Sequence, residues 1–137
     1  TVAQHCMECW AEAKARKLSE EIQMFCLLHD GAEAYLGDFI HPVKERMPAY
    51  VSAEEKLLQM IYQKFIGRLP DEEEKKIIKE IDHTLLYFEF LHYMGTGCGE
   101  PGQGLASTPV FAEMPRQEME RQYLALCRKM MKKREKD

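Results

Sequence analysis

The sequence predicts an all-α fold, and three observations support this prediction. Apolar residues recur at helical spacing in several segments, and no stretch of useful length alternates between apolar and polar residues as a half-buried strand would. Five of the eight glycines fall in one stretch, residues 95–109, and leave the periodic segments almost free of helix breakers. We therefore expect a compact bundle of about five to six helices. With 137 residues, the chain fits a single domain, 1–137, that is large enough to bury a hydrophobic core.

The first third of the chain predicts two helices followed by a break. Residues 2–17 are rich in Ala, Glu, Lys and Met, which favour helix. Ser19 is a suitable N-cap for a second helix, whose apolar positions lead into the doublet His29 and Asp30. Residues 37–42 then interrupt the pattern, because they contain both Gly and Pro.

The remaining two thirds predict three further helices. The segment 52–55 (Ser-Ala-Glu-Glu) has the pattern of a capping box that opens a helix, and Gly67 is expected to close that helix. Residues 70–71 (Pro-Asp) begin a long helix, whose acidic first turn complements the helix dipole. Residues 95–115 are predicted to form a loop and residues 116–137 a C-terminal helix.

Charge and composition narrow the possible partners and location. The formal net charge is −4, which argues against nucleic acid as a partner because non-specific binding needs a positive surface. No segment is long and apolar enough to span a membrane and no signal peptide is visible, so we expect a cytoplasmic protein. The five cysteines are odd in number, which favours reduced thiols, and we interpret the isolated pair Cys6 and Cys9 as small buried thiols rather than a zinc or redox motif.

The most informative feature is a set of metal-binding residue types on helices that are far apart in the sequence. His29 and Asp30 end an apolar helix, His5 lies on the helix before it, and Asp82 lies on the apolar side of the long helix. A carboxylate on an apolar face is costly unless it is paired or binds a metal. If the three helices pack together, these four residues could bind one divalent cation, with Gly31 permitting the irregular turn that neighbouring ligands require.

Residues near the doublet suggest chemistry at such a cation. Glu33 could orient or deprotonate a water molecule bound to the metal, or protonate a leaving alkoxide. Asp38 could contact a polar substrate group such as a ribose hydroxyl. Lys44 and Arg46 are the nearest cations and could neutralise phosphate charge.

Together these residues resemble the H…HD…D signature of the HD-domain metal-dependent phosphohydrolases. The stretch from His29 to Lys44 is similar to the HD-x-x-E…GD…P-x-K segment of the branch that contains bacterial 5′-deoxynucleotidases. The resemblance covers about residues 2–94. It implies a helical fold and one divalent metal ion, which His5, His29, Asp30 and Asp82 would bind. It also implies that Glu33 serves the attacking water and that Asp38 contacts the sugar. Some phosphate-contacting residues of that family lie upstream of its first histidine, where this chain has only four residues.

These patterns favour a metal-dependent 5′-nucleotidase that releases phosphate from a (deoxy)nucleoside 5′-monophosphate. Two alternatives stay open: a phosphodiesterase or pyrophosphohydrolase acting on cyclic or polyphosphorylated nucleotides, and a non-catalytic module that binds metal and nucleotide. The ligand set is compatible with Mn, Co, Mg, Zn or Fe. A homodimer is expected from the resemblance and from an apolar stripe on the last helix.

Overall fold

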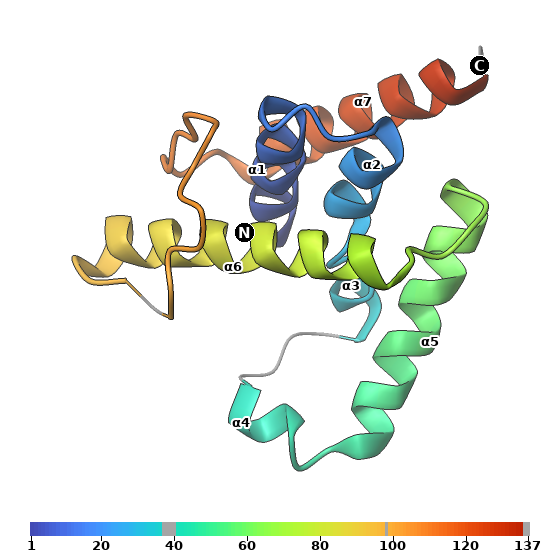
Figure 1. The fold of residues 1–137 in the computed structure, drawn as a ribbon, viewed down its shortest axis with the longest axis horizontal. Helices are drawn as coiled ribbons and strands as arrows, with labels where there is room; N and C mark the ends of the chain where they lie inside the picture. The colour runs from blue at the N-terminus through green and yellow to red at the C-terminus, as the bar shows by residue number, and fades with distance from the viewer. Residues whose placement is uncertain (37–40, 98, 136–137) are drawn as a thin grey trace.

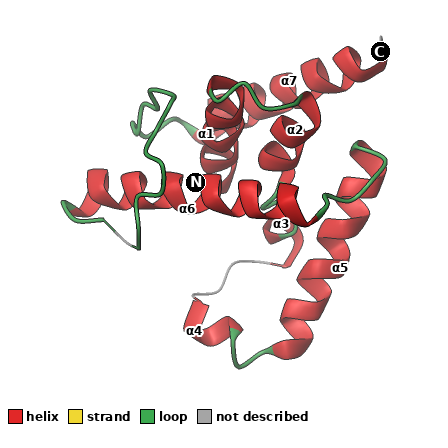
Figure 2. Ribbon diagram, in the orientation of Figure 1, coloured by secondary structure: helices red, strands yellow, loops and turns green. Residues whose placement is uncertain are grey.

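The fold is all-α, as the sequence predicts. The computed structural model describes residues 1–36, 41–97 and 99–135 (Figure 1). Within these ranges there are seven helices and no strand (Figure 2). Five helices are long, and α3 and α4 have four residues each. In chain order the helices are α1 (Val2–Ala15), α2 (Glu20–Leu28), α3 (Glu33–Leu36), α4 (His41–Lys44), α5 (Pro48–Phe65), α6 (Glu72–Met94) and α7 (Arg116–Glu135).

The helix ends predicted at Ser19 and Gly67 are confirmed, and the long helix begins next to the predicted Pro-Asp pair, 70–71. Helix α2 starts after Ser19, whose hydroxyl accepts a hydrogen bond from the backbone N–H of Ile22. Helix α6 starts after Asp71, and the Asp71 and Glu74 side chains form a reciprocal capping box. Gly67 follows the end of α5 with a φ of 88°, a conformation that glycine adopts without steric cost.

The predicted start of α5 is wrong. The helix begins at Pro48, four residues before the segment 52–55, so Ser52 lies inside it rather than at its N-cap. Proline suits the first position of a helix, because its φ is already helical and its missing N–H would have no partner there. The start of α5 is therefore determined by Pro48, and the resemblance of residues 52–55 to a capping box is coincidental.

The hydrophobic core is built around α2. Six of its nine residues are buried, and it contacts α1, α5, α6 and α7. The packing of α1 on α2 is the most extensive, and α6 runs across both helices (Figure 1). The core includes Phe25 and Leu27 from α2 and Ile81 and Leu85 from α6, all at 0–1% exposure. This packing brings the N-terminal half of α1, the C-terminal end of α2 and the middle of α6 together.

A buried acid, Glu12, and a partly exposed one, Glu80, fasten the long loop between α6 and α7 onto the helices. The Glu12 carboxylate is fully buried and accepts hydrogen bonds from the backbone N–H groups of Ala106 and Ser107, from the Ser107 hydroxyl and from Arg16 Nε. Arg16 also pairs with Glu80 and donates to the Gly104 carbonyl. The network satisfies loop backbone groups that packing has removed from water.

Gly102 allows the same loop to approach α6 closely. Its φ is 62°, and a Cβ atom there would lie 2.3 Å from Glu80 Oε1 and 2.6 Å from Thr84 Oγ1. A side chain at this position would therefore displace the Glu80 carboxylate, which accepts a hydrogen bond from the backbone N–H of Gln103.

We predict that Glu12→Ala lowers the free energy of unfolding by about 3–5 kcal/mol, because it leaves the backbone N–H groups of Ala106 and Ser107 without an acceptor and removes one of the two acids that pair with Arg16. Glu12→Gln keeps the volume and should cost less, about 1–3 kcal/mol. Urea denaturation monitored by circular dichroism measures both changes. As a matched control, Glu118→Gln removes an exposed pair with Arg121 and should change stability by less than about 0.5 kcal/mol.

Glu12→Gln also tests how the free energy of unfolding depends on pH. Burial raises the pKa of Glu12, but hydrogen bonds from Ala106, Ser107 and Arg16 outweigh burial, and the net pKa is lowered. A carboxyl whose pKa is lower in the folded state stabilises the fold above its unfolded pKa, and this stabilisation is lost as the pH falls through the folded value. The unfolding free energy of the unmodified protein should therefore fall more steeply in acid than that of Glu12→Gln. Equal slopes would contradict the assignment.

Candidate metal centre

Three predicted ligands meet at one carboxylate oxygen. Asp82 Oδ1, from the middle of α6, lies 2.7 Å from His5 Nε2 on α1 and 3.1 Å from His29 Nε2 at the end of α2. The His5 and His29 side chains are 8% and 9% exposed, and Asp82 is 24% exposed. Two imidazole nitrogens and a carboxylate oxygen therefore face one another at a partly buried point between three helices.

The fourth predicted ligand, Asp30, lies beside this group. Asp30 Oδ2 is 3.3 Å from His29 Nε2 and 4.0 Å from His5 Nε2. Neighbouring residues of a regular helix point about 100° apart, but α2 ends at Leu28 and the chain turns before α3. Gly31 is in this turn, where a Cβ atom would lie 3.0 Å from the Leu28 carbonyl oxygen and 3.2 Å from Ile61 Cδ1. The turn allows both residues of the doublet to face the same point.

The second nitrogen of each imidazole is occupied by an acceptor. His5 Nδ1 lies 2.7 Å from Glu89 Oε1, and His29 Nδ1 lies 2.6 Å from the Cys26 carbonyl oxygen. A carboxylate and a carbonyl oxygen only accept, so each Nδ1 donates a proton and each Nε2 is the nitrogen that a cation can bind. Hydrogen bonding of this kind orients histidine ligands in metal sites.

A further acid lies beside Glu89. Burial, together with the hydrogen bond and negative charge of Glu89, raises the pKa of Glu8 to about 8. Glu8 is therefore a neighbour of the carboxylate that pairs with His5 Nδ1.

The electrostatics of the group suit a cation. Burial alone lowers the pKa values of His5 and His29, but hydrogen bonds to Asp82 and to neighbouring thiols, with Glu89 also acting on His5, outweigh burial and raise both. Burial raises the pKa of Asp82, and the two histidines outweigh that effect and lower it well below its usual range. Positive charge is thus stabilised between these residues. A divalent cation bound to both Nε2 atoms would replace protons there.

The donor set fits a divalent cation in its chemistry as well. Two imidazole nitrogens and two carboxylate oxygens are typical ligands of Zn²⁺, Mn²⁺, Fe²⁺ and Co²⁺. The four predicted ligands would bind the ion, with Glu89 and the Cys26 carbonyl orienting the imidazoles.

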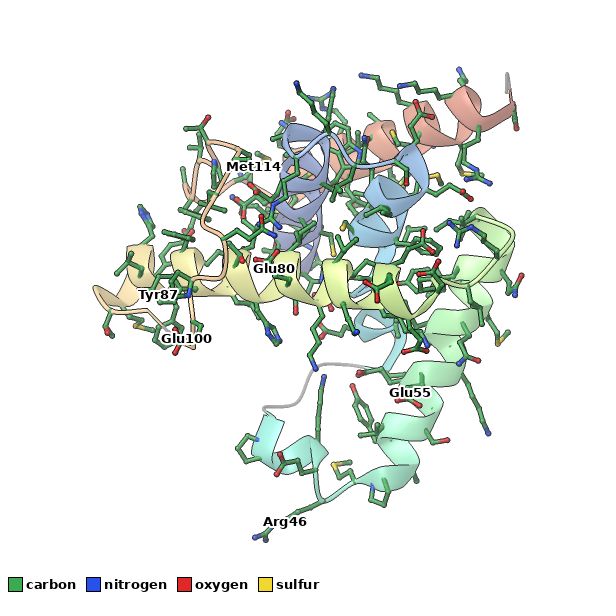
Figure 3. The ribbon with its side chains drawn as sticks, in the orientation of Figure 1. Arg46, Glu55, Glu80, Tyr87, Glu100 and Met114 are labelled. Carbon is green, nitrogen blue, oxygen red and sulfur yellow. The ribbon has the colours of Figure 1, made fainter. Side chains whose placement is uncertain are left out.

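Of the other predicted site residues, Glu33 follows the doublet directly and Lys44 lies near Glu33. Glu33 is the first residue of α3, and its backbone N–H donates to the Asp30 carbonyl. Lys44 Nζ lies 3.9 Å from Glu33 Oε1 and 3.3 Å from Glu54 Oε2. Asp38 lies outside the described residues, so its predicted contact with a sugar stays a prediction. Arg46 points outward from the turn between α4 and α5, away from α6 (Figure 3).

Two cavities reach the predicted ligands, one beside α1 and α7 and the other beside α5 and α6. The first has a volume of about 580 Å³ and is lined by Asp30 and Glu33 together with apolar side chains of α1 and α7. Arg116, at the start of α7, is its single basic lining residue among those described. The second, about 600 Å³, lies between α5 and α6 and is lined by His29, Asp82, Lys75 and Lys79.

Sequence reasoning missed two of these residues. Glu89 lies seven residues, or two turns, after Asp82 on the same face of α6, so its spacing from a suspected ligand was a usable signal. Arg116 gave no such signal, because only the packing of α7 against α1 brings it beside Asp30 and Glu33.

The chain has distant relatives among curated proteins, although no family model matches it. The 5′-deoxynucleotidases of Yersinia pestis (strain Pestoides F) and Yersinia pseudotuberculosis serotype O:3 (strain YPIII) are each 26% identical to it over 98 residues. The aligned part covers 60% of this chain and 50% of each relative, so the chain spans about half the length of the curated relatives it matches. These matches support a distant relationship to 5′-deoxynucleotidases.

Proposed function

We propose that this protein is a metal-dependent phosphohydrolase that releases phosphate from (deoxy)nucleoside 5′-monophosphates. The observation that carries the proposal is the approach of His5 and His29 Nε2 to one oxygen of Asp82, with Asp30 beside them. The similarity to 5′-deoxynucleotidases supports the nucleotide as the substrate.

The proposed chemistry divides between the cation and the side chains. When bound, a divalent cation lowers the pKa of its water and polarises a phosphoryl oxygen. Glu33 would accept the proton of the attacking water and return one to the leaving alkoxide. Its position three residues after Asp30, on the wall of the first cavity, supports this role. Lys44, held near Glu33 and Glu54, would neutralise phosphate charge, and Asp38 would bind the sugar.

The first cavity is the proposed substrate site. It combines two acids of the proposed reaction centre with one basic residue and apolar walls, including Val2, Met119 and Leu124. A nucleoside monophosphate has a matching division, with an anionic end that reacts and a largely apolar base. We therefore assign Arg116 to the phosphate and the apolar walls to the nucleoside.

We predict that protein stripped of metal hydrolyses no nucleoside monophosphate, and that Mn²⁺, Co²⁺, Zn²⁺ or Mg²⁺ restores release of inorganic phosphate. A colorimetric phosphate assay over a panel of (deoxy)nucleoside 5′-monophosphates measures this. If no metal restores release from any of them, the proposed activity is wrong. If cyclic nucleotides or nucleoside triphosphates are cleaved instead, without inorganic phosphate as the first product, the phosphodiesterase or pyrophosphohydrolase alternative replaces it.

Glu33→Gln tests the proposed proton transfer separately from metal binding. Because the amide cannot accept the proton of water, kcat should fall by about 10²–10⁴-fold while the metal content stays the same. Glu120→Gln is a matched control, since Glu120 lines the same cavity on α7 without a proposed chemical role. Equal kcat values for Glu33→Gln and the unmodified protein would remove Glu33 from the reaction. If only nucleotide affinity is measurable, and Glu33→Gln leaves it unchanged, the non-catalytic module is favoured.

Arg116→Ala tests the assignment of the substrate cavity. Loss of a charge-assisted hydrogen bond of about 1.5–3 kcal/mol should raise KM for the monophosphate by about 10- to 150-fold. Arg121→Ala, five residues later on α7 and paired with Glu118, should leave KM unchanged. If Lys79→Ala raises KM and Arg116→Ala does not, the phosphate enters the second cavity between α5 and α6 instead.

A further inference from the structure

Cys9 lies one helical turn after His5 on α1, and its thiol faces the same point as the His5 imidazole. Cys9 Sγ is 3.5 Å from His5 Nε2, and the residue is 1% exposed. Residues four apart lie on one face of a helix, so α1 presents an imidazole and a thiol together. The prediction that Cys9 is a small buried thiol agrees with its burial. It does not explain why the sulfur is directed at a nitrogen that faces Asp82.

The thiol fits the distances of a metal site. One ligand atom from each of His5, Cys9, His29 and Asp82 lies within 4.8 Å of every other. In a tetrahedral site with a metal–sulfur bond of about 2.3 Å and a metal–nitrogen bond of about 2.05 Å, sulfur and nitrogen are about 3.6 Å apart. The observed 3.5 Å between Cys9 and His5 matches this separation without any rearrangement of α1.

Burial alone does not place a thiol in this way. Cys26 is 0% exposed and comes from the helix that carries His29, yet among the described residues it joins no group of potential ligands. Cys127, on α7, is also outside these groups. Cys6 belongs to a second group, with His29 and Asp30. Because Cys6 directly follows His5 on α1, the two residues lie on different faces of that helix.

We propose that Cys9 is a metal ligand beside His5, His29 and Asp82, and that the site therefore selects Zn²⁺ or Co²⁺ over Mg²⁺ and Mn²⁺. Thiolate is a soft donor, which stabilises zinc and cobalt but is a poor ligand for the hard cations that prefer oxygen. Asp30, 3.3 Å from His29 Nε2, would then lie beside the ion, so that the fifth position that zinc can accept stays open for the water of the proposed reaction. This inference rests on the metal site of the proposed function and adds the class of metal.

The experiment uses Co²⁺ as a spectroscopic probe of the stripped protein. A cobalt–thiolate bond gives an intense ligand-to-metal charge-transfer band in the near ultraviolet, which nitrogen and oxygen ligands do not give. We expect the unmodified protein and Cys127→Ser to show this band at one equivalent of Co²⁺, and Cys9→Ser to lose it. Zn²⁺ affinity, measured by competition with a chromophoric chelator, should fall by more than about tenfold in Cys9→Ser, while Mn²⁺ affinity should change little.

The outcomes separate this proposal from the proposed function. If Co²⁺ binds to the unmodified protein and supports phosphate release without a charge-transfer band, Cys9 is not a ligand and the phosphohydrolase proposal stands. If the band persists in Cys9→Ser and is lost in Cys6→Ser, the ligand is Cys6 and the assignment to Cys9 is overturned. If no divalent cation binds at all, both proposals fail.

A second measurement needs no substitution, because Cys9→Ser lies in the core and its folding has to be checked by circular dichroism. X-ray absorption of the zinc-loaded unmodified protein counts sulfur neighbours directly. One sulfur at about 2.3 Å supports the proposal, and a shell of nitrogen and oxygen alone at about 2.0–2.2 Å overturns it.

Discussion

The packing of two imidazoles against one carboxylate is the constraint on which the rest of the structure depends. His5, His29 and Asp82 come from three helices, and each group would be costly to bury alone. Together they offset that cost, because each histidine forms one hydrogen bond with Asp82 through Nε2 and another, through Nδ1, with a second acceptor. The same arrangement makes the group suited to a cation, since a divalent ion can replace the shared protons and retain every other hydrogen bond.

The fold keeps these groups in place by packing and by polar contacts farther out. Helix α2 is buried along most of its length, so the position of its C-terminal end, and with it His29 and Asp30, is fixed by core contacts. Helix α1 is held at its other end by the Glu12 and Arg16 network, which fastens residues 104–107 to it. The core contacts include Cys9 itself, whereas the Glu12 and Arg16 network fastens the loop to α1 away from the proposed ligands.

The proposed role of Cys9 bears on which metal ion the site would prefer. Histidine and aspartate accept a broad range of divalent cations, so they leave the choice of metal open. If the Cys9 thiol, which is directed at the same point, binds the ion as we propose, it would narrow that choice toward softer ions. In this interpretation α1 contributes two ligands: His5, which the site requires, and Cys9, which determines the metal that the site prefers.

The sequence by itself determined the helical architecture and the identity of the metal-binding residue types. Apolar spacing, the N-cap Ser19 and the Pro-Asp pair at 70–71 are local properties, and they predicted the start of α2 and, to within about two residues, that of α6. The start of α5 was missed because Pro48 and the segment 52–55 are both plausible helix starts, and a helix that begins at Pro48 includes Ser52 in its interior. A charged residue on the apolar face of a helix, Asp82, was a sound indication that a partner had to exist, because burying an unpaired charge is unfavourable.

Only the tertiary structure decided which partners meet. The roles of Glu89 and Arg116 depend on how α6 and α7 pack against α1, and the direction of the Cys9 thiol depends on the rotation of α1 about its axis. The spacing of Glu89 from Asp82 and of Cys9 from His5 puts each pair on one face of a helix, but it does not say what that face meets. Contacts between residues far apart in the chain form through the packing of whole helix faces. The residue types could therefore be identified in the sequence, whereas the distances between them are set only when the helices pack around a shared core.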